Sequence, residues 1–79
     1  MMRKKKYLEE KELVALAKQF REASGKSKVS VAREFGVAAP NIFNAEERPE
    51  MSLTKLRVRI IEAFSPFKVI GPVYYLEKK

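Results

Sequence analysis

The sequence predicts a small, mainly α-helical bundle that ends in a short C-terminal β segment. Apolar residues recur every three or four positions over most of residues 7–64, which is the helical period. Glycine and proline interrupt that period at intervals that fit short helices. Residues 65–79 are instead rich in Val, Ile, Tyr and Phe, which favour strands. With 79 residues in total, we expect one domain.

The first helix is predicted from Tyr7 to about Ser24. Its buried stripe follows the i, i+3, i+4, i+7 spacing: Leu13, Leu16, Ala17 and Phe20. Acidic residues lie near its start, where the helix dipole favours them: Glu9, Glu10 and Glu12. Gly25 is expected to end this helix as its C-cap.

The second and third helices are predicted to be short and joined by a glycine. Residues 26–35 form the second helix, capped by Ser27, with three inward residues: Val31, Ala32 and Phe35. Gly36 ends it at a positive φ. Residues 37–48 form the third helix, and Pro40 suits its first turn. Its buried edge is Val37, Ile42 and Ala45, and Pro49 disfavours helical geometry at Arg48.

A fourth helix is predicted from Ser52 to about Phe64, with an apolar side of Leu53, Leu56, Ile60 and Phe64. Its solvent side is Lys55, Arg59 and Glu62. The last segment predicts two short strands around Gly71-Pro72, or one kinked strand.

Apolar residues occupy both sets of alternate positions in this last segment, and therefore both faces of an extended strand. Val69, Val73 and Tyr75 fall on one, and Ile70, Tyr74 and Leu76 on the other. Cover on both faces is therefore expected. The bundle would cover one face, and a second subunit would cover the other, which makes these six residues a predicted dimerisation element. The alternative is a monomer whose hairpin folds over its own helices.

Composition bears on the class of function. The chain has no His, Cys or Asp, which removes the commonest general base, nucleophile and metal ligands. We therefore expect no enzyme, no metal and no cofactor. The net charge of +7 indicates a polyanionic partner, although many small soluble proteins are basic. Residues 1–6 are predicted to be a disordered basic arm.

Targeting features are not evident in the sequence. No apolar run is long enough to span a bilayer, and the basic start continues into "YLEEKE", so no signal peptide is expected. The lack of cysteine fits a reducing compartment, and a cytoplasmic location is predicted.

Four residues at consistent spacing predict two helices locked across a tight turn. Ala32 allows a close crossing, Gly36 reverses the chain, and Val37 and Ile42 fix the angle. These residues resemble the pattern of the Cro/repressor helix-turn-helix family of phage and bacterial regulators, with a further small residue at Ala45. The resemblance covers residues 28–47 closely and 7–64 loosely, and the size and β-rich end are most similar to phage Cro. It implies DNA binding, with dimerisation through the last strands.

The helix that would read DNA is expected at about residues 39–47. The candidate base contacts lie on it or just before it: Ala38, Ala39, Asn41, Phe43 and Asn44. An amide offers the donor and acceptor that the adenine edge requires, and Ala or Phe can contact a thymine methyl. The uncapped helix start could receive a phosphate oxygen. Alternatively, the asparagines are only poor helix formers or Asn41 assists the helix start, and Phe43 folds back on the fourth helix. Glu47 is expected to face outward, accepting from a cytosine amino group or pairing with Arg48.

Candidate phosphate contacts flank this helix: Lys26, Ser27, Lys28, Ser30, Arg33 and Arg48, with Lys55 as a further candidate. The family often has a polar residue where this chain has Val29, so Ser30 or Lys28 would take that role. The arm could follow a groove of the DNA. Four lysines are expected to be solvated surface charges: Lys18, Lys68, Lys78 and Lys79.

Together these features predict a sequence-specific, Cro-like repressor. Residues 7–64 would form the DNA-binding domain and residues 65–79 the dimerisation element. The homodimer would bind a pseudo-palindrome on double-stranded DNA, with recognition helices about 34 Å apart. No membrane and no small-molecule substrate are expected. The alternatives are a protein-interaction module, such as an antitoxin or adaptor, using the apolar C-terminal segment, and nonspecific binding to nucleic acid or a membrane surface through residues 1–6.

Overall fold

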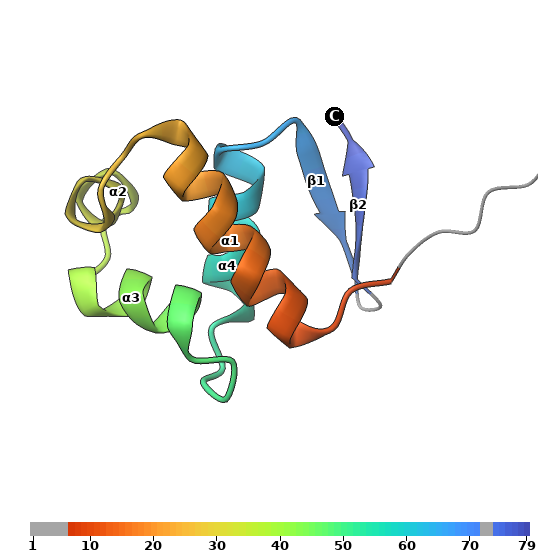
Figure 1. Ribbon diagram of the computed structural model, residues 1–79, viewed down its shortest axis with the longest axis horizontal. Helices are drawn as coiled ribbons and strands as arrows, with labels where there is room; N and C mark the ends of the chain where they lie inside the picture. The colour runs from red at the N-terminus through yellow and green to blue at the C-terminus, as the bar shows by residue number, and fades with distance from the viewer. Residues whose placement is uncertain (1–6, 72–73) are drawn as a thin grey trace, which may run out of the picture.

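The computed structural model describes residues 7–71 and 74–79 and has four helices followed by an antiparallel β-hairpin (Figure 1). The mainly α-helical fold class is confirmed. The elements are α1 (Glu10–Ser24), α2 (Lys28–Phe35), α3 (Ala39–Glu47), α4 (Thr54–Ala63), β1 (Phe67–Ile70) and β2 (Tyr75–Lys78). The predicted arm, residues 1–6, and Val73 of the predicted dimerisation element lie outside the described residues.

Helix α1 begins at Glu10, three residues later than predicted. Glu9 is its N-cap and forms a capping box with Glu12, in which each side chain accepts the other residue's backbone N–H. Leu8 is extended instead, and its N–H donates to the carbonyl of Tyr74 at 2.6 Å. The chain before α1 is therefore bonded to the hairpin. Gly25 ends α1 in the left-handed region at φ 79°, as expected.

The turn between α2 and α3 has the predicted geometry. The Ser27 hydroxyl caps α2 by accepting the Ser30 N–H at 3.1 Å. Gly36 ends α2 at φ 71°, a conformation that costs a residue with a Cβ roughly 1–2 kcal/mol. The Val37 N–H then donates to the carbonyl of Ala32 at 2.9 Å, which closes the turn. Helix α3 starts at Ala39, two residues after the predicted start, with Pro40 in its first turn.

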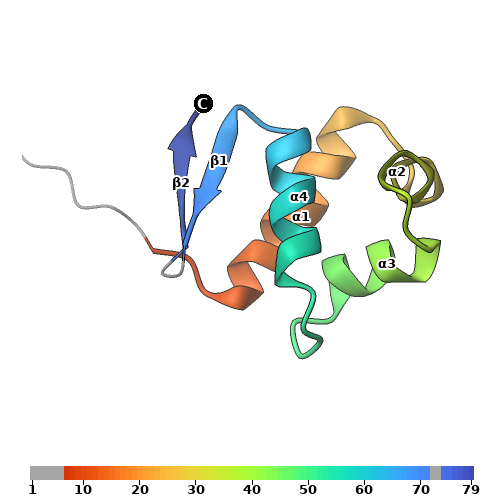
Figure 2. The same ribbon diagram turned by 180° about the vertical axis from the view of Figure 1, so that it is seen from behind.

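The core lies between α1 and α4, which run side by side through the middle of the molecule (Figures 1 and 2). Helices α2 and α3 pack on one side of this pair and the hairpin on the other. The fully buried apolar side chains come from all four helices: Leu13, Ala17, Val31, Ile42, Ala45, Ile60 and Ile61. Several residues predicted to be buried are only half-buried: Leu16, Phe20, Phe35, Val37, Leu53, Leu56 and Phe64. The buried faces of α1 and α4 are rotated by about one residue from the predicted stripes, toward Val14 and Arg21, and Arg57 and Ile61.

The C-terminal segment is a hairpin, so the one-strand alternative is wrong. Its register pairs Val69 with Leu76 and Ile70 with Tyr75. Val69 and Leu76 pack against the core, which places Ile70 and Tyr75 on the outer face. The alternation in the sequence predicted Val69 and Tyr75 on the same face. This prediction is wrong, because the turn between the strands places Val69 on the same face as Leu76 and not Tyr75. Tyr74, in the turn, also packs against the core.

The hairpin is anchored on α4. Glu62, predicted on the solvent side, is half-buried and accepts the backbone N–H of Val69 at 2.9 Å. Phe67 adds a ring contact to Phe20 of α1, with centroids 6.3 Å apart. Across residues 7–71 and 74–79, no helix combines the length and apolar character needed to cross a bilayer.

Candidate nucleic-acid interface

The outer face of α3 carries the residues predicted to read bases. Asn41 is exposed and Asn44 is half-buried, whereas Ile42 and Ala45 on the opposite face are completely buried. Phe43 is 45% exposed, and its ring lies 5.9 Å from the Lys28 ammonium of α2. The alternative in which Phe43 folds back on α4 is therefore wrong.

The two asparagine amides are available for a ligand. Neither side chain makes a hydrogen bond within the described part of the chain. Asn41 does not assist the helix start, because the N-cap is Ala38 and no side chain caps α3. Ala38 is exposed, but Ala39 is half-buried against the core. Of the two alanines predicted to contact bases, only Ala38 is thus presented openly.

The predicted phosphate contacts divide into two groups. Ser27, Lys28 and Ser30 lie together at the start of α2, and Lys28 links this helix end to the outer face of α3 through Phe43. Lys26 and Arg48 are already engaged, since Lys26 pairs with Glu34 at 2.8 Å and Arg48 lies 3.6 Å from Glu50.

Two candidates remain: Lys55 lies exposed in α4, and Arg33 lies exposed in the last turn of α2. Of these two, only Arg33 belongs to α2. It makes no ion pair with any residue that the structure describes. No contact brings it to the outer face of α3. The start of α2 is therefore the best-placed cationic group beside the candidate base contacts.

Glu47 has a partner that the sequence did not indicate. It was expected to accept from a cytosine amino group or to pair with Arg48, but it accepts from the Lys18 ammonium at 2.8 Å. Lys18 was expected to be a solvated charge but is paired, and so are two other lysines of that group: Lys68 pairs with Glu77, and Lys79 donates to the carbonyls of Glu62 and Ser65. The side-chain hydrogen bond from Lys18 lowers the pKa of the Glu47 carboxyl, and the same bond raises the pKa of Lys18. The Lys18 ammonium thereby offsets the carboxylate charge of Glu47 at the end of the face that would meet DNA.

Two buried arginines hold α3 in place. Arg21 of α1 donates from Nε and Nη2 to the two carboxylate oxygens of Glu46, at 2.5 and 3.0 Å, and Glu46 is 2% exposed. Arg57 of α4 is completely buried. It donates to the carbonyls of Ala45 and Arg48, at 2.9 and 2.6 Å, and so caps the C-terminal end of α3.

Neither arginine was predicted to be buried, although the sequence carries a signal for both. Arg57 lies three and four residues before Ile60 and Ile61, and Arg21 lies four residues after Ala17, so both occupy stripe positions. Glu46 likewise follows Ile42 by four residues. Charged residues of opposite sign on buried faces of different helices indicate a buried ion pair.

The chain was compared with protein-family models, with curated proteins and with solved structures, and no match was found. Among the residues described, no cluster of three His, Cys, Asp or Glu side chains could hold a metal ion. The surface around α3 presents amide groups, the Phe43 ring and the Lys28 ammonium.

Proposed function

We propose that this protein is a sequence-specific DNA-binding regulator that acts as a Cro-like repressor, with α3 as its recognition helix. The observation that carries the proposal is the contrast between the two faces of α3. Its inner face is fixed by the buried ion pair of Glu46 and by the capping Arg57, while its outer face presents amides without partners among the described residues. A rigid helix with exposed amides is suited to reading base edges in the major groove.

Each part of this surface has a role in the proposal. Asn44 and Asn41 would donate to and accept from adenine edges, and Phe43 with Ala38 would contact thymine methyls or sugar. Lys28 and Ser30 at the start of α2 would bind the flanking phosphate. Because affinity would come mainly from phosphate contacts, binding would weaken steeply with salt.

The proposed assembly is a homodimer formed through the outer face of the hairpin. Val69, Tyr74 and Leu76 pack against the bundle of their own chain, whereas Ile70 lies on the other face of the hairpin, where Tyr75 packs against Tyr7. In the proposed dimer a partner subunit would cover Ile70. Lys68 and Glu77, which form a 3.4 Å ion pair on the same face, would lie at the rim. A two-fold axis there would present two recognition helices to a pseudo-palindrome, about 34 Å apart.

Selection of bound DNA from a random duplex pool tests the proposal. We expect an enriched pseudo-palindrome whose half-sites are about one helical turn apart. The variant Asn41→Ala/Asn44→Ala should lose the enrichment, whereas Gln19→Ala, a matched amide removal on the exposed face of α1, should retain it. Tight binding without any enriched sequence would contradict the proposal and favour nonspecific nucleic-acid binding.

A second candidate is a protein-interaction module that uses the hairpin. It is favoured by the apolar outer face, where Tyr7 packs edge-on against Tyr75 with centroids 5.9 Å apart. Deleting residues 66–79 would also uncover the core, so a surface change is the better test. If this candidate holds, the DNA pool shows no enrichment, and Ile70→Lys abolishes capture of the partner protein without loss of helical content.

A further inference from the structure

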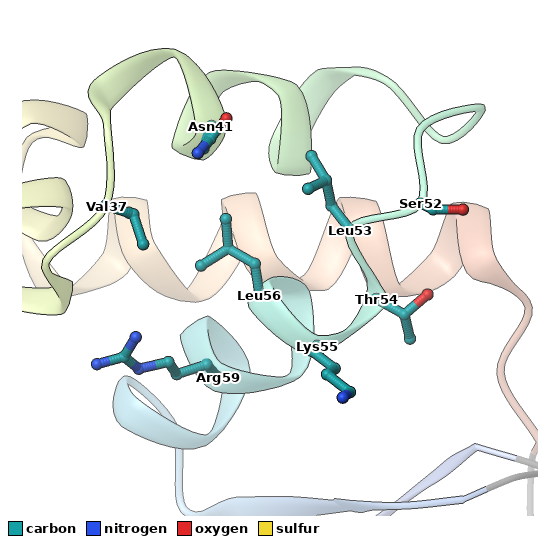
Figure 3. Close-up of a pocket in the computed structure, with 8 residues that line it drawn as sticks. All are labelled: Val37, Asn41, Ser52, Leu53, Thr54, Lys55, Leu56 and Arg59. Carbon is teal, nitrogen blue, oxygen red and sulfur yellow. The ribbon is translucent and has the colours of Figure 1, made fainter.

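A groove of about 560 Å³ separates α3 from the start of α4 (Figure 3). Its floor is aliphatic, formed by Val37, Leu53 and Leu56. Asn41 and Leu56 point toward one another across it from the two helices (Figure 3). This volume is in the range of small-molecule sites, which combine an apolar floor with a few polar groups.

The charges at the rim of the groove are all positive. Lys55 and Arg59 line it, together with Ser52 and Thr54, and no acidic residue does. The Thr54 hydroxyl is already bonded to Glu10, whose carboxylate pairs with the buried Arg57. Arg59 lies over the ring of Phe35, 4.3 Å from its centroid, and donates to the Phe35 carbonyl at 3.1 Å. Lys55 is exposed and makes no ion pair with the residues that the structure describes.

From this combination we propose that the groove binds a small amphiphilic carboxylate, whose apolar chain covers the floor and whose carboxylate meets Lys55. An aliphatic chain matches Val37, Leu53 and Leu56, since burying apolar area is favourable on both sides. A negative head group matches the sign of the rim. A neutral or cationic amphiphile of the same length would gain only the apolar contact.

The groove also points to regulation, a step that rests on the proposed function. Asn41 lines the groove and is a candidate base contact, so an occupant shares a residue with the DNA surface. A bound carboxylate would add negative charge beside α3 and engage the Asn41 amide. The ligand and the operator would therefore oppose each other, each lowering the affinity for the other by the same factor.

Titration of the full chain with octanoate, octanol and octylammonium, followed by methyl and amide NMR, tests the site. We expect octanoate to bind with a dissociation constant on the order of 1 mM and to shift the methyls of Val37, Leu53 and Leu56. Lys55→Glu should weaken octanoate about fivefold and favour octylammonium instead. Lys78→Glu, the same reversal at an exposed position of β2, should change neither. Equal binding of the three amphiphiles, or shifts spread over the whole surface, would overturn the site.

The regulatory step is tested by operator affinity with saturating octanoate, against acetate at the same ionic strength. We expect octanoate to weaken operator binding at least fivefold in the wild type. Unchanged affinity with an occupied groove would overturn the coupling. The ligand site and the proposed DNA binding can be contradicted independently of each other, because the NMR titration requires no DNA and the DNA selection requires no carboxylate.

Discussion

Asn41 and Asn44 look equivalent in the sequence but occupy different positions on α3. Asn41 lies on the side that faces α4 and lines the groove, and Asn44 lies half-buried toward the middle of the outer face. Partial burial limits the orientations in which the Asn44 amide can meet a base. Asn41 belongs to both the proposed DNA surface and the proposed ligand groove. We expect sequence preference to depend more on Asn44 and ligand response more on Asn41.

Asn44→Ala should reduce discrimination between the selected operator and a single-base variant of it. One good bidentate amide contact contributes about 1–3 kcal/mol of discrimination, so the ratio of affinities should fall roughly ten- to hundredfold. The free energy of unfolding should change little, because the amide makes no hydrogen bond among the described residues. Fluorescence anisotropy on both duplexes measures the ratio; an unchanged ratio would remove Asn44 from the base contacts.

The Lys18–Glu47 pair predicts a pH dependence. The pKa of Glu47 is lowered below the usual 4.5, so its stabilising contribution is present above that pH and is lost as the pH falls through the lower, folded-state value. The pKa of Lys18 is raised above 10.5, and its contribution is lost as the pH rises through the higher value.

A carboxyl ¹³C NMR titration of Glu47 checks this pair. In Lys18→Met the midpoint of Glu47 should move up toward the usual value, because the hydrogen bond is lost. Lys11→Met, which removes an exposed lysine 3.5 Å from Glu9, serves as the control and should leave the Glu47 midpoint in place. Identical midpoints in wild type and Lys18→Met would show that the pair does not form in solution.

At the level of elements, the orientation of α3 depends on charged residues within the core. Glu46→Met should destabilise the protein by about 3–5 kcal/mol, because it leaves Arg21 buried without its carboxylate. The double variant Arg21→Met/Glu46→Met should be more stable than Glu46→Met, since no uncompensated charge remains. Urea unfolding measures the free energy of unfolding of each variant. If the loss in the double variant equals the sum of the losses in the two single variants, coupling across the pair is excluded.

The contact between α2 and α3 predicts the effect of a larger side chain at residue 32. Ala32 is 3% exposed, and its carbonyl accepts the N–H groups of Gly36 and Val37 in the turn. Ala32→Leu should cost roughly 1–3 kcal/mol by overpacking and should disturb the turn. Ala23→Leu, on the exposed side of α1, is the matched control and should cost much less. Equal free energies of unfolding for the two variants would contradict a close crossing at Ala32.

For the whole molecule, the hairpin and α3 lie on opposite sides of the α1–α4 pair (Figure 2). The Cα atoms of the residues in both strands lie more than 8 Å from those of α2 and α3. A change at the outer face of the hairpin is thus remote from the proposed DNA surface. We therefore expect such a change to affect DNA binding through assembly.

Ile70→Lys should convert the proposed dimer to a monomer, because it places a charge in the apolar outer face. Sedimentation should show the mass halved with an unchanged circular dichroism spectrum, and operator affinity should fall at least tenfold as one half-site contact is lost. Lys68→Gln, at the rim of the same face, should remain dimeric. A wild type that is monomeric at all concentrations would contradict the dimer.

Much of the helical layout was predictable because its determinants are local. Ser27, Gly25 and Gly36 mark helix ends through their own backbone preferences, and the structure confirms all three. The start of α1 was not predictable in this way. The helical period continues through Tyr7, but a hydrogen bond to Tyr74, distant in sequence, holds the segment extended.

The candidate site also combines features that the sequence predicts with features that only the tertiary structure shows. The composition and the spacing of Ala32, Gly36 and Ile42 suffice to propose a basic protein with a recognition helix, because spacing and charge are properties of the chain alone. Only the packed structure shows that Arg21 and Arg57 hold that helix, that Lys18 neutralises Glu47, and that an aliphatic groove opens beside Asn41. These features arise where segments far apart in sequence meet, and burial strengthens the Arg21–Glu46 pair beyond what it would be in water.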